Sequence, residues 1–357
     1  MSLLEIEDLK VHFPIKKGVL IERVAGHVYA VDGVSLSVEQ GQTYGLVGES
    51  GCGKTTLGRA VLRLVPVTAG SVRFRDVDLA KLSVEDMRRQ RSRLQMVFQD
   101  PMSSLDPRQN VASILSEGLH AHGVGVDSRG KVDRKLLRER IDTTLDAVGL
   151  PRNALSRYPH EFSGGQRQRI GIARALVLQP DLIICDEPVS ALDVSIQAQV
   201  LNLLEEIQEN LGVAYMVIAH DLAVVRHISD VLGVMYLGGL VEEAPSDLIY
   251  AEPRHPYTKS LMSAVPVPDP DVEDARERIL LQGDLPSPSN PPPGCRFQTR
   301  CPWKQETRCA DERPELRVVS EGHRVACHWA EQIAAGEIRP SSELAAPILP
   351  GATVQDK

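Results

Sequence analysis

The residues Gly48-Glu49-Ser50-Gly51-Cys52-Gly53-Lys54-Thr55 form a complete glycine-rich loop directly after the short apolar stretch 44–47. That stretch predicts a buried strand. Glycines between a strand and a helix let backbone N–H groups and the helix N-terminus point at the phosphates of a nucleotide. In this pattern Lys54 reaches the β- and γ-phosphates and Thr55 meets Mg²⁺, with Thr56 beside it. The chain is therefore expected to bind a nucleoside triphosphate.

An apolar run that ends in two acids supports the same chemistry. Residues 182–185 are all apolar, as in a central parallel strand, and Asp186 and Glu187 follow them. Functional groups gather at the carboxyl ends of such strands. We expect Asp186 to hold Mg²⁺ and Glu187 to orient and polarise the attacking water. The alternative is a helix N-terminus that favours acids, since Pro188 comes next.

A third motif, Phe162-Ser163-Gly164-Gly165-Gln166, predicts a helix start that binds an anion. Ser163 can cap this helix, because Ile170, Ala173 and Val177 then fall on one face. The chain already has its own phosphate loop. The second anion site therefore suggests a nucleotide held by another subunit, and an ordinary capped helix is the alternative.

The order and spacing of these motifs resemble ABC ATPases, and residues 162–169 resemble the signature sequence of that family. The resemblance implies head-to-tail dimers, with ATP held between one subunit's phosphate loop and the other's signature. It also implies an α/β fold with a β-rich subdomain, a parallel-sheet core and a helical subdomain, followed here by a small Cys-rich C-terminal domain. The implied ATP-binding residues are Gly48, Glu49, Ser50, Gly51, Cys52, Gly53, Lys54, Thr55, Thr56 and Asp186, with Ser163, Gly164, Gly165 and Gln166 serving the partner's ATP.

Further residues match other parts of that family's site. Gln99 matches the glutamine that contacts Mg²⁺ and water and senses the membrane subunit, and His220 matches the histidine at the γ-phosphate. Asp193 resembles the acid of the loop that couples the two sites. Phe13 matches the aromatic residue that stacks on adenine, with Tyr29 as the alternative. The resemblance thus implies three catalytic residues, Glu187, His220 and Gln99, and three Mg²⁺ contacts, Thr55, Gln99 and Asp186.

Composition and charge limit the function classes. The chain has 357 residues, 42% of them hydrophobic, and a formal net charge of −8. An acidic chain lacks the basic footprint that grips nucleic acid. No apolar run reaches the roughly 20 residues that span a bilayer, and the start of the chain is too acidic for a signal peptide. We expect a cytosolic protein that reaches the cytoplasmic face of the inner membrane through partners.

The sequence predicts three consecutive parts. Residues 1–262 form the ATPase domain, with a helical subdomain at about 83–165. Residues 263–333 form a C-terminal domain entered through a proline-rich connector, since eight of the 24 prolines lie at 266–293. Residues 334–357 are expected to be a loose tail. The stretch His255 to Leu261 resembles the oligopeptide and dipeptide importer branch of ABC ATPases, and the start of the chain resembles the second ATPase of such systems.

Four cysteines cluster near the C-terminus. Cys295, Cys301, Cys309 and Cys327 have the spacing C-x5-C-x7-C-x17-C, whereas Cys52 and Cys185 fit structural roles. In a cytosolic protein such a group is better explained as metal or cluster ligands than as disulfides. Four thiolates suit zinc or a four-iron cluster, although zinc usually takes tighter spacings. The importer resemblance implies a [4Fe-4S] cluster, with Zn²⁺ as the alternative.

The expected function is ATP hydrolysis that powers uptake of di- or oligopeptides. The implied partners are a second, related ATPase, two membrane permeases and, indirectly, an extracytoplasmic solute-binding protein. Alternatives are an importer for nickel or another small solute, or a soluble ABC ATPase whose cysteines serve redox chemistry. ABC ATPases of DNA repair fit poorly, because only about a hundred residues without sustained heptads separate Thr56 from Ser163. Two-cassette translation proteins fit poorly because this chain has one cassette.

Overall fold

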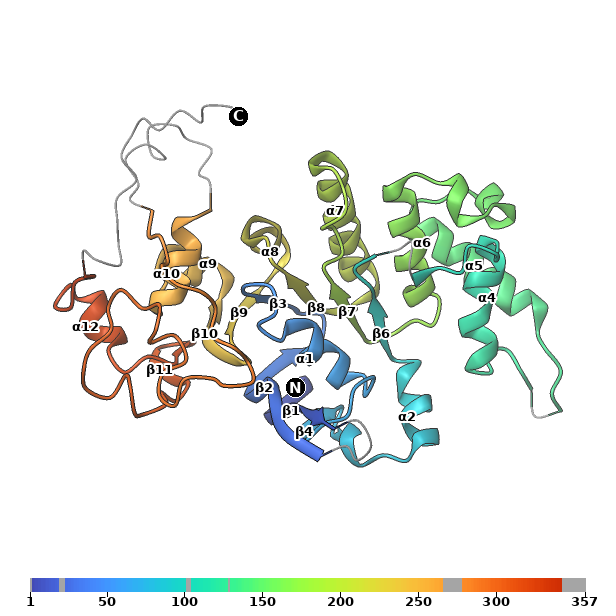
Figure 1. Ribbon diagram of the computed structural model, residues 1–357. Helices are drawn as coiled ribbons and strands as arrows, with labels where there is room; N and C mark the ends of the chain where they lie inside the picture. Colours follow the sequence, from blue (N-terminus) through green and yellow to red (C-terminus); the bar gives the residue numbers. More distant parts are fainter. Residues whose placement is uncertain (1, 19–22, 101–103, 128, 266–277, 342–357) are drawn as a thin grey trace. The chain divides into compact units, whose positions relative to one another are not determined.

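The computed structural model describes residues 2–18, 23–100, 104–127, 129–265 and 278–341 (Figure 1). They form two compact units that interleave along the chain. Unit 1 contains Met1–Val11, Gly33–Val47 and Lys54–Asp230. Unit 2 contains His12–Asp32, Gly48–Gly53 and Val231–Lys357. Because the units interleave, they do not follow the linear division at residues 262 and 333, which stays a prediction.

The centre of unit 1 is a parallel sheet in the order β3-β8-β7-β6. Its strands are β3 (Thr43–Val47), β8 (Ala214–Ala219), β7 (Leu182–Asp186) and β6 (Leu94–Val97). Every residue of β3, β7 and β8 is buried, as expected where helices cover both faces of a parallel sheet. The buried strands predicted before the phosphate loop and before Asp186 are therefore confirmed.

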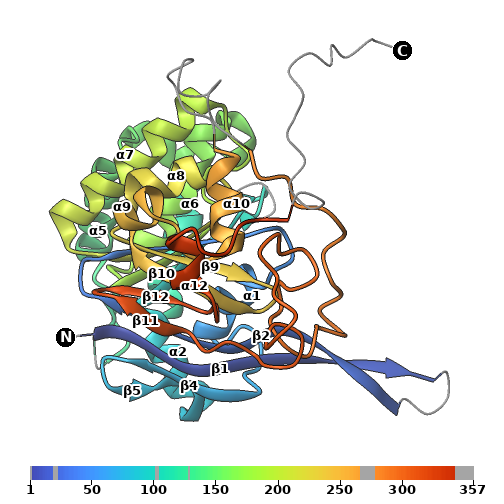
Figure 2. The same cartoon turned by 90° about the vertical axis from the view of Figure 1, so that its left-hand side faces the viewer.

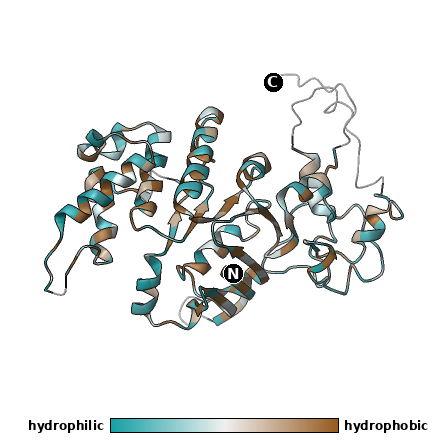
Figure 3. Cartoon of the chain, turned by 180° about the vertical axis from the view of Figure 1, so that it is seen from behind, coloured by the Kyte–Doolittle hydropathy of each residue, from teal (hydrophilic) through white to brown (hydrophobic). Residues whose placement is uncertain are grey.

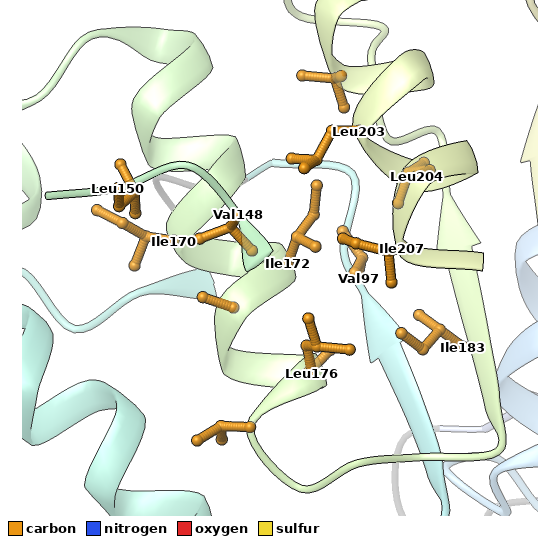
Figure 4. Packing of buried hydrophobic residues seen from close by; sticks show 14 of the residues in the cluster. Val97, Val148, Leu150, Ile170, Ile172, Leu176, Ile183, Leu203, Leu204 and Ile207 are labelled. Carbon is orange, nitrogen blue, oxygen red and sulfur yellow. The ribbon is translucent and has the colours of Figure 1, made fainter. Parts of the chain in front are cut away.

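The helices of unit 1 pack through one large hydrophobic cluster, part of which Figure 4 shows. Ile172 and Leu176 belong to α6, and they share this cluster with Leu203 of α7 and Ile183 of β7. Apolar residues at three- and four-residue spacing place one face of each helix in the core. The helices are α1 (Lys54–Val61), α2 (Val84–Arg91), α4 (Val111–Ala121), α5 (Arg134–Ala147), α6 (Gly164–Leu176), α7 (Val194–Leu211) and α8 (Leu222–Ile228), with 3₁₀ turns η1 (Leu79–Lys81), η2 (Arg152–Ser156) and η3 (Pro159–Glu161).

The region predicted to be helical after residue 83 also contains a strand, which corrects that expectation. Strand β6 lies between α2 and α4, and its residue Met96 is paired in register with Ile184 of β7. Three of its four residues are buried. A four-residue segment with three apolar residues is too short for a stable helix, and beside a central strand it completes the sheet instead.

A second sheet has the order β2-β1-β4-β5. Its strands are β1 (Ser2–Lys17), β2 (Arg23–Glu39), β4 (Ala69–Phe74) and β5 (Val77–Asp78). Strand β1 pairs with β4 in antiparallel register, with Ile6 opposite Val72. The long strands β1 and β2 are visible in Figure 2. Antiparallel pairing at the start of the chain agrees with the alternating pattern of its sequence.

Unit 2 contains an antiparallel group of strands in the order β9-β10-β12-β11. These are β9 (Val231–Tyr236), β10 (Gly239–Pro245), β11 (Arg317–Ser320) and β12 (His323–Val325), and the helices are α9 (Ser246–Ala251), α10 (Pro256–Ser263) and α12 (Ala330–Ala334). Residues 278–294 contain no helix or strand, as their prolines predict. Of the predicted tail, residues 342–357 lie outside the described residues.

Hydropathy follows this arrangement. In Figure 3, hydrophobic and hydrophilic positions alternate along the helices, as in helices with one buried face. Among the residues that the structure describes, no helix combines the length and apolar character needed to cross a membrane.

Candidate functional site

Asp186 and Thr55 meet in unit 1. Thr55, the second residue of α1, donates its hydroxyl to Asp186 Oδ1 at 2.8 Å. Asp186 ends β7 and is 1% exposed. Burial raises the pKa of Asp186 above its ordinary value, against the lowering effects of Thr55 and Arg59. A hydroxyl and a carboxylate supply the hard oxygen ligands that Mg²⁺ prefers.

Glu187 is the centre of a second contact group in unit 1. Its Oε2 accepts a hydrogen bond from Gln99 Nε2 at 2.7 Å and lies 3.3 Å from His220 Nδ1. The three residues follow β6, β7 and β8, so the parallel sheet brings together residues that lie far apart in sequence. The structure therefore brings Glu187 into contact with both of the other predicted catalytic residues.

The backbone of Glu187 is itself unusual. Its φ is 47°, in the left-handed region that costs a non-glycine residue about 1–2 kcal/mol. Its N–H donates to the carbonyl of Ile218 at 2.8 Å, which holds the turn against β8. The next helix, α7, begins only at Val194. The acids therefore end a strand, and the alternative of a helix N-terminus at this point is wrong.

The glycines of the phosphate loop lie in unit 2 and are required by its backbone. Gly48, Gly51 and Gly53 have φ values of 151°, 80° and 108°. A Cβ on Gly48 would come within 2.1 Å of the Met235 carbonyl oxygen, and one on Gly53 within 2.0 Å of the Ala30 carbonyl oxygen. Only glycine allows this positive φ together with such close backbone approach.

The other loop residues have distinct surroundings. Cys52 is 1% exposed, and its carbonyl accepts a hydrogen bond from Gly238 N–H at 2.9 Å, which fits a structural role. Ser50 is exposed and Glu49 is half-buried. In unit 1, Lys54 begins α1 and is 5% exposed, and Thr56 follows in the same turn.

The signature residues form a capped helix start in unit 1. Ser163 Oγ accepts from Gln166 N–H at 3.3 Å, and Gln166 Oε1 accepts from Ser163 N–H at 3.1 Å. Gly164 and Gly165 open α6. A Cβ on Gly165 would lie 2.6 Å from Ile196 Cγ2, so glycine lets α6 approach α7 closely. Both Ser163 and Gln166 are exposed in the described chain, as residues that serve a partner's nucleotide must be.

The remaining predicted residues lie at the surface or in strands. Asp193 is exposed at the N-cap position of α7, and its carbonyl accepts from Gln197 N–H at 2.9 Å. Phe13 is half-buried in β1. Tyr29, in β2, contacts the His12 ring edge-on at 4.7 Å between ring centroids. Adenine stacking by Phe13 stays a prediction, with Tyr29 as the alternative.

The four clustered cysteines line one small cavity in unit 2, together with aromatic residues such as Trp303 and Trp329. Burial raises the pKa of Cys295 to about 11 and that of Cys327 to about 12. All four are free thiols. Among the described residues, however, no three metal-binding side chains are arranged to hold a single metal ion. The structure thus gathers the predicted ligands without forming a compact one-ion site.

The sequence did not reveal a groove of about 750 Å³ in unit 1. Residues of β6, of α4 (such as Ile114) and of α6 (Arg174) line it, together with Phe98 and Gln99 directly after β6. The Arg174 guanidinium lies 5.8 Å from the centre of the Phe98 ring and donates to the Ser104 carbonyl. A possible signal was the aromatic residue directly before Gln99, but only the fold shows that α4 and α6 complete the groove.

Comparison with known proteins agrees with this geometry. The model of the ABC transporter family matches residues 31–190, and the model of the oligopeptide/dipeptide transporter C-terminal region matches residues 241–309. The chain is 53% identical over 326 residues to the oligopeptide transport ATP-binding protein OppF of Salmonella typhimurium, covering 91% of this chain and 95% of that protein. It is 51% identical over 328 residues to AppF of Bacillus subtilis, covering 92% and 97%.

Solved structures share the fold. One is cbiO1 of Clostridium perfringens, part of an ABC transporter complex, with a TM-score of 0.60, 25% identity and coverage of 70% of this chain and 91% of that one. Another is a dimeric ATP-binding cassette bound to ADP and Pi, with a TM-score of 0.58, 24% identity and coverage of 68% and 98%. With its ATPase contact group and its C-terminal region, this chain belongs to the ATP-binding proteins of ABC transporters, in the oligopeptide and dipeptide branch.

Proposed function

We propose that this chain is the ATP-hydrolysing subunit that powers uptake of di- or oligopeptides by an ABC importer. The contact of Glu187 with both Gln99 and His220 is the observation that supports it most directly. An ABC ATPase needs a water-positioning acid between a sensor and a γ-phosphate contact. The names of the relatives, which are oligopeptide transport ATP-binding proteins, support peptides over nickel or another small solute.

The residues of unit 1 divide the catalytic work. Thr55 and Asp186 would hold Mg²⁺, and the raised pKa of Asp186 fits a carboxylate that binds a cation. Glu187 orients the water for in-line attack on the γ-phosphorus, and Gln99 and His220 fix that carboxylate. Phosphoryl transfer needs little covalent help, so positioning and charge stabilisation supply most of the rate.

Residues 163–166 serve the ATP of a partner subunit. Their capped helix start presents N–H groups and the positive end of the helix dipole toward solvent, where an anion binds favourably. Closure of two subunits around two ATP molecules then completes both sites, and Asp193 couples them. We propose a second, related ATPase as the partner, and attachment at the cytoplasmic face of the inner membrane.

The groove beside Gln99 supports contact with a membrane permease. It is lined by apolar residues such as Phe98 and Ile114 and by basic residues such as Arg174, a combination that suits a short amphipathic helix. Because Gln99 lines this groove and also contacts Glu187, occupation of the groove can alter the position of the catalytic acid. Two permeases, one for each ATPase, complete the importer, with an extracytoplasmic solute-binding protein that delivers the peptide.

We propose that the four cysteines hold a [4Fe-4S] cluster, with zinc as the alternative. A tetrahedral zinc ion with Zn–S bonds of about 2.3 Å needs its thiolates roughly 3.8 Å apart. No such compact group exists among the described residues, although all four thiols line one cavity. A four-iron cluster is larger, so its thiolates lie farther apart. Cys295, Cys301, Cys309 and Cys327 would hold it, and it would tie together a segment with few helices and strands.

The peptide function is tested on the assembled transporter. The intact membrane complex should contain two permeases, and peptide with its binding protein should stimulate ATP turnover more than a nickel complex does. A complex that responds to nickel and not to peptides would contradict the proposed substrate.

The cluster is tested separately, on chain prepared without oxygen. We expect iron and acid-labile sulfide in equal amounts with broad visible absorption. Cys301→Ser should lower both, and Cys185→Ala, a control outside the cavity, should retain both. If the preparation contains zinc and no iron, the alternative ion is favoured. If it contains neither metal, the proposed cluster is contradicted.

A further inference from the structure

Within unit 2, the cysteine-rich segment, residues 295–327, contacts the phosphate loop directly. Arg300 Nη1 lies 2.8 Å from Glu49 Oε2 and 3.1 Å from Glu49 Oε1, so one nitrogen faces both oxygens of the carboxylate. The Arg300 side chain is 10% exposed and that of Glu49 is 28% exposed. A partly buried, charge-assisted contact of this kind is stronger and better ordered than a surface ion pair.

A second route connects the same segment to the same loop residue. The backbone N–H of Glu49 donates to the Tyr257 hydroxyl at 2.8 Å. The Tyr257 ring packs against Phe297 at 5.4 Å between ring centroids, and both side chains are almost fully buried. Phe297 lies between Cys295 and Cys301 in sequence. The side chain of Glu49 is therefore held by the cysteine-rich segment itself, and its backbone by Tyr257 of α10, which packs against that segment.

A third set of contacts connects the cysteine-rich segment to Asp32 of β2 and from there to the phosphate loop. Arg296, directly after Cys295, donates to Asp32 Oδ2, and Arg313 approaches the same oxygen at 3.0 Å. Asp32 N–H donates to the Gly238 carbonyl at 2.7 Å, and Gly238 N–H donates to the Cys52 carbonyl at 2.9 Å. This chain of hydrogen bonds connects the cysteine-rich segment to the middle of the phosphate loop.

We infer that the cysteine-rich segment sets the nucleotide affinity of this chain, with Arg300 as a positioning residue that orders the phosphate loop through Glu49. Arg300 directly precedes Cys301, and Arg296 directly follows Cys295. Any group held by these thiols also fixes the backbone from which both arginines extend. The inference rests on the proposed ATP site but not on the transported solute. It concerns ground-state binding, because a loop ordered before binding loses less entropy when the phosphates arrive.

The test measures the dissociation constant of a fluorescent ATP analogue for the full chain. Arg300→Gln should weaken binding roughly tenfold, within the range of ordinary coupling energies. Arg308→Gln is the matched control, because Arg308 forms a similar two-bond pair with Glu312 in the same segment, at 2.7 and 2.9 Å, but at the exposed surface. Arg300→Lys should recover part of the affinity, since an ammonium keeps the charge but not the planar geometry.

Three further measurements separate positioning from general damage to the fold. Glu49→Gln should weaken binding as Arg300→Gln does, and the double variant should be no weaker than either alone. In the assembled transporter, Arg300→Gln should raise KM for ATP while kcat at saturating ATP stays at its original value. Tyr257→Phe keeps the ring packing and removes only the hydroxyl, so it should also weaken binding, by a smaller factor.

If Arg300→Gln and Glu49→Gln bind the analogue as tightly as Arg308→Gln, while Lys54→Ala loses binding, the inference is wrong and the ATP site stands. If Lys54→Ala also binds normally, the ATP site itself is wrong. Additive losses in the double variant would show that the two side chains act independently, and would overturn the role of Arg300.

Discussion

Asp186 in unit 1 and Asp32 in unit 2 are both shielded carboxylates, yet their pKa values move in opposite directions. Burial raises the pKa of Asp186, which accepts a hydrogen bond from the neutral hydroxyl of Thr55. Burial also acts on Asp32, but Arg296, His12 and Arg313 hold its pKa below the usual value. An acid with a raised pKa suits reversible binding of a cation. An ionised acid that is already paired with arginines suits a permanent structural contact. The carboxylate of unit 1 therefore suits metal binding, and that of unit 2 forms a permanent ion pair.

The first prediction tests whether the unit 1 acids act in turnover and not in folding. Glu187→Gln should slow ATP hydrolysis by about a thousandfold, because the neutral amide cannot polarise the attacking water. Binding of ATP should persist and a closed dimer should accumulate. Single-turnover hydrolysis and gel filtration measure the two effects. Glu205→Gln is the control, since Glu205 lies beside His227 away from the contact group. Hydrolysis at the original rate would remove Glu187 from its role.

The second prediction makes the opposite claim for unit 2. Arg296→Gln should lower the free energy of unfolding by roughly 3 kcal/mol, because Asp32 loses a buried cationic partner. The Arg296 side chain is 8% exposed, and burial lowers its pKa to about 10, so the pair is strongly shielded. Urea unfolding measures the loss, with the exposed Arg308→Gln as the control. Unchanged stability would mean that this contact positions the chain without stabilising it.

The third prediction concerns the pH dependence of folding stability and tests a buried histidine of unit 2. Burial lowers the pKa of His255 to about 4, against the opposing effects of Glu242 and the Ala326 backbone. The unfolded chain therefore binds a proton below about pH 6.5 that the folded chain does not, and stability falls as the pH drops toward 4. We expect this histidine to contribute a loss of about 2 kcal/mol between pH 7 and pH 5.

His255→Asn isolates that contribution. Asparagine keeps an acceptor at the N-cap of α10, where His255 Nδ1 now accepts from Tyr257 N–H at 3.1 Å. Urea unfolding at several pH values should give a flatter dependence for the variant than for the original chain. Parallel curves over this window would show that His255 is not the group responsible.

The fourth prediction is the smallest and settles which aromatic residue serves the nucleotide. Loss of a stacking ring should weaken ATP binding roughly three- to tenfold. Phe13→Leu should have this effect and Tyr29→Leu should not, if Phe13 stacks on adenine. GTP competition gives a second measurement, because a stacking contact tolerates either base. The reverse result would assign the stacking to Tyr29, whose ring already contacts His12.

The contact group around Glu187 in unit 1 was largely predictable because its residues occupy short motifs. Each of Gln99, Glu187 and His220 follows its own apolar strand, and parallel strands bring their carboxyl ends to one edge. Strand β6 was missed, since four residues inside a helical region carry too weak a pattern. The left-handed backbone of Glu187 also had no signal in the sequence.

The contacts of the cysteine-rich segment in unit 2 were not predictable in the same way. Its cysteine spacing indicated a common site, and the four thiols do line one cavity. Nothing in the chain marked Arg300 or Arg296 among its many arginines, because their partners Glu49 and Asp32 lie 251 and 264 positions away. Local motifs determine phosphate chemistry, since glycines and strand ends act over a few residues. Only folding selects which charges meet across hundreds of residues, because that choice depends on how every intervening element packs.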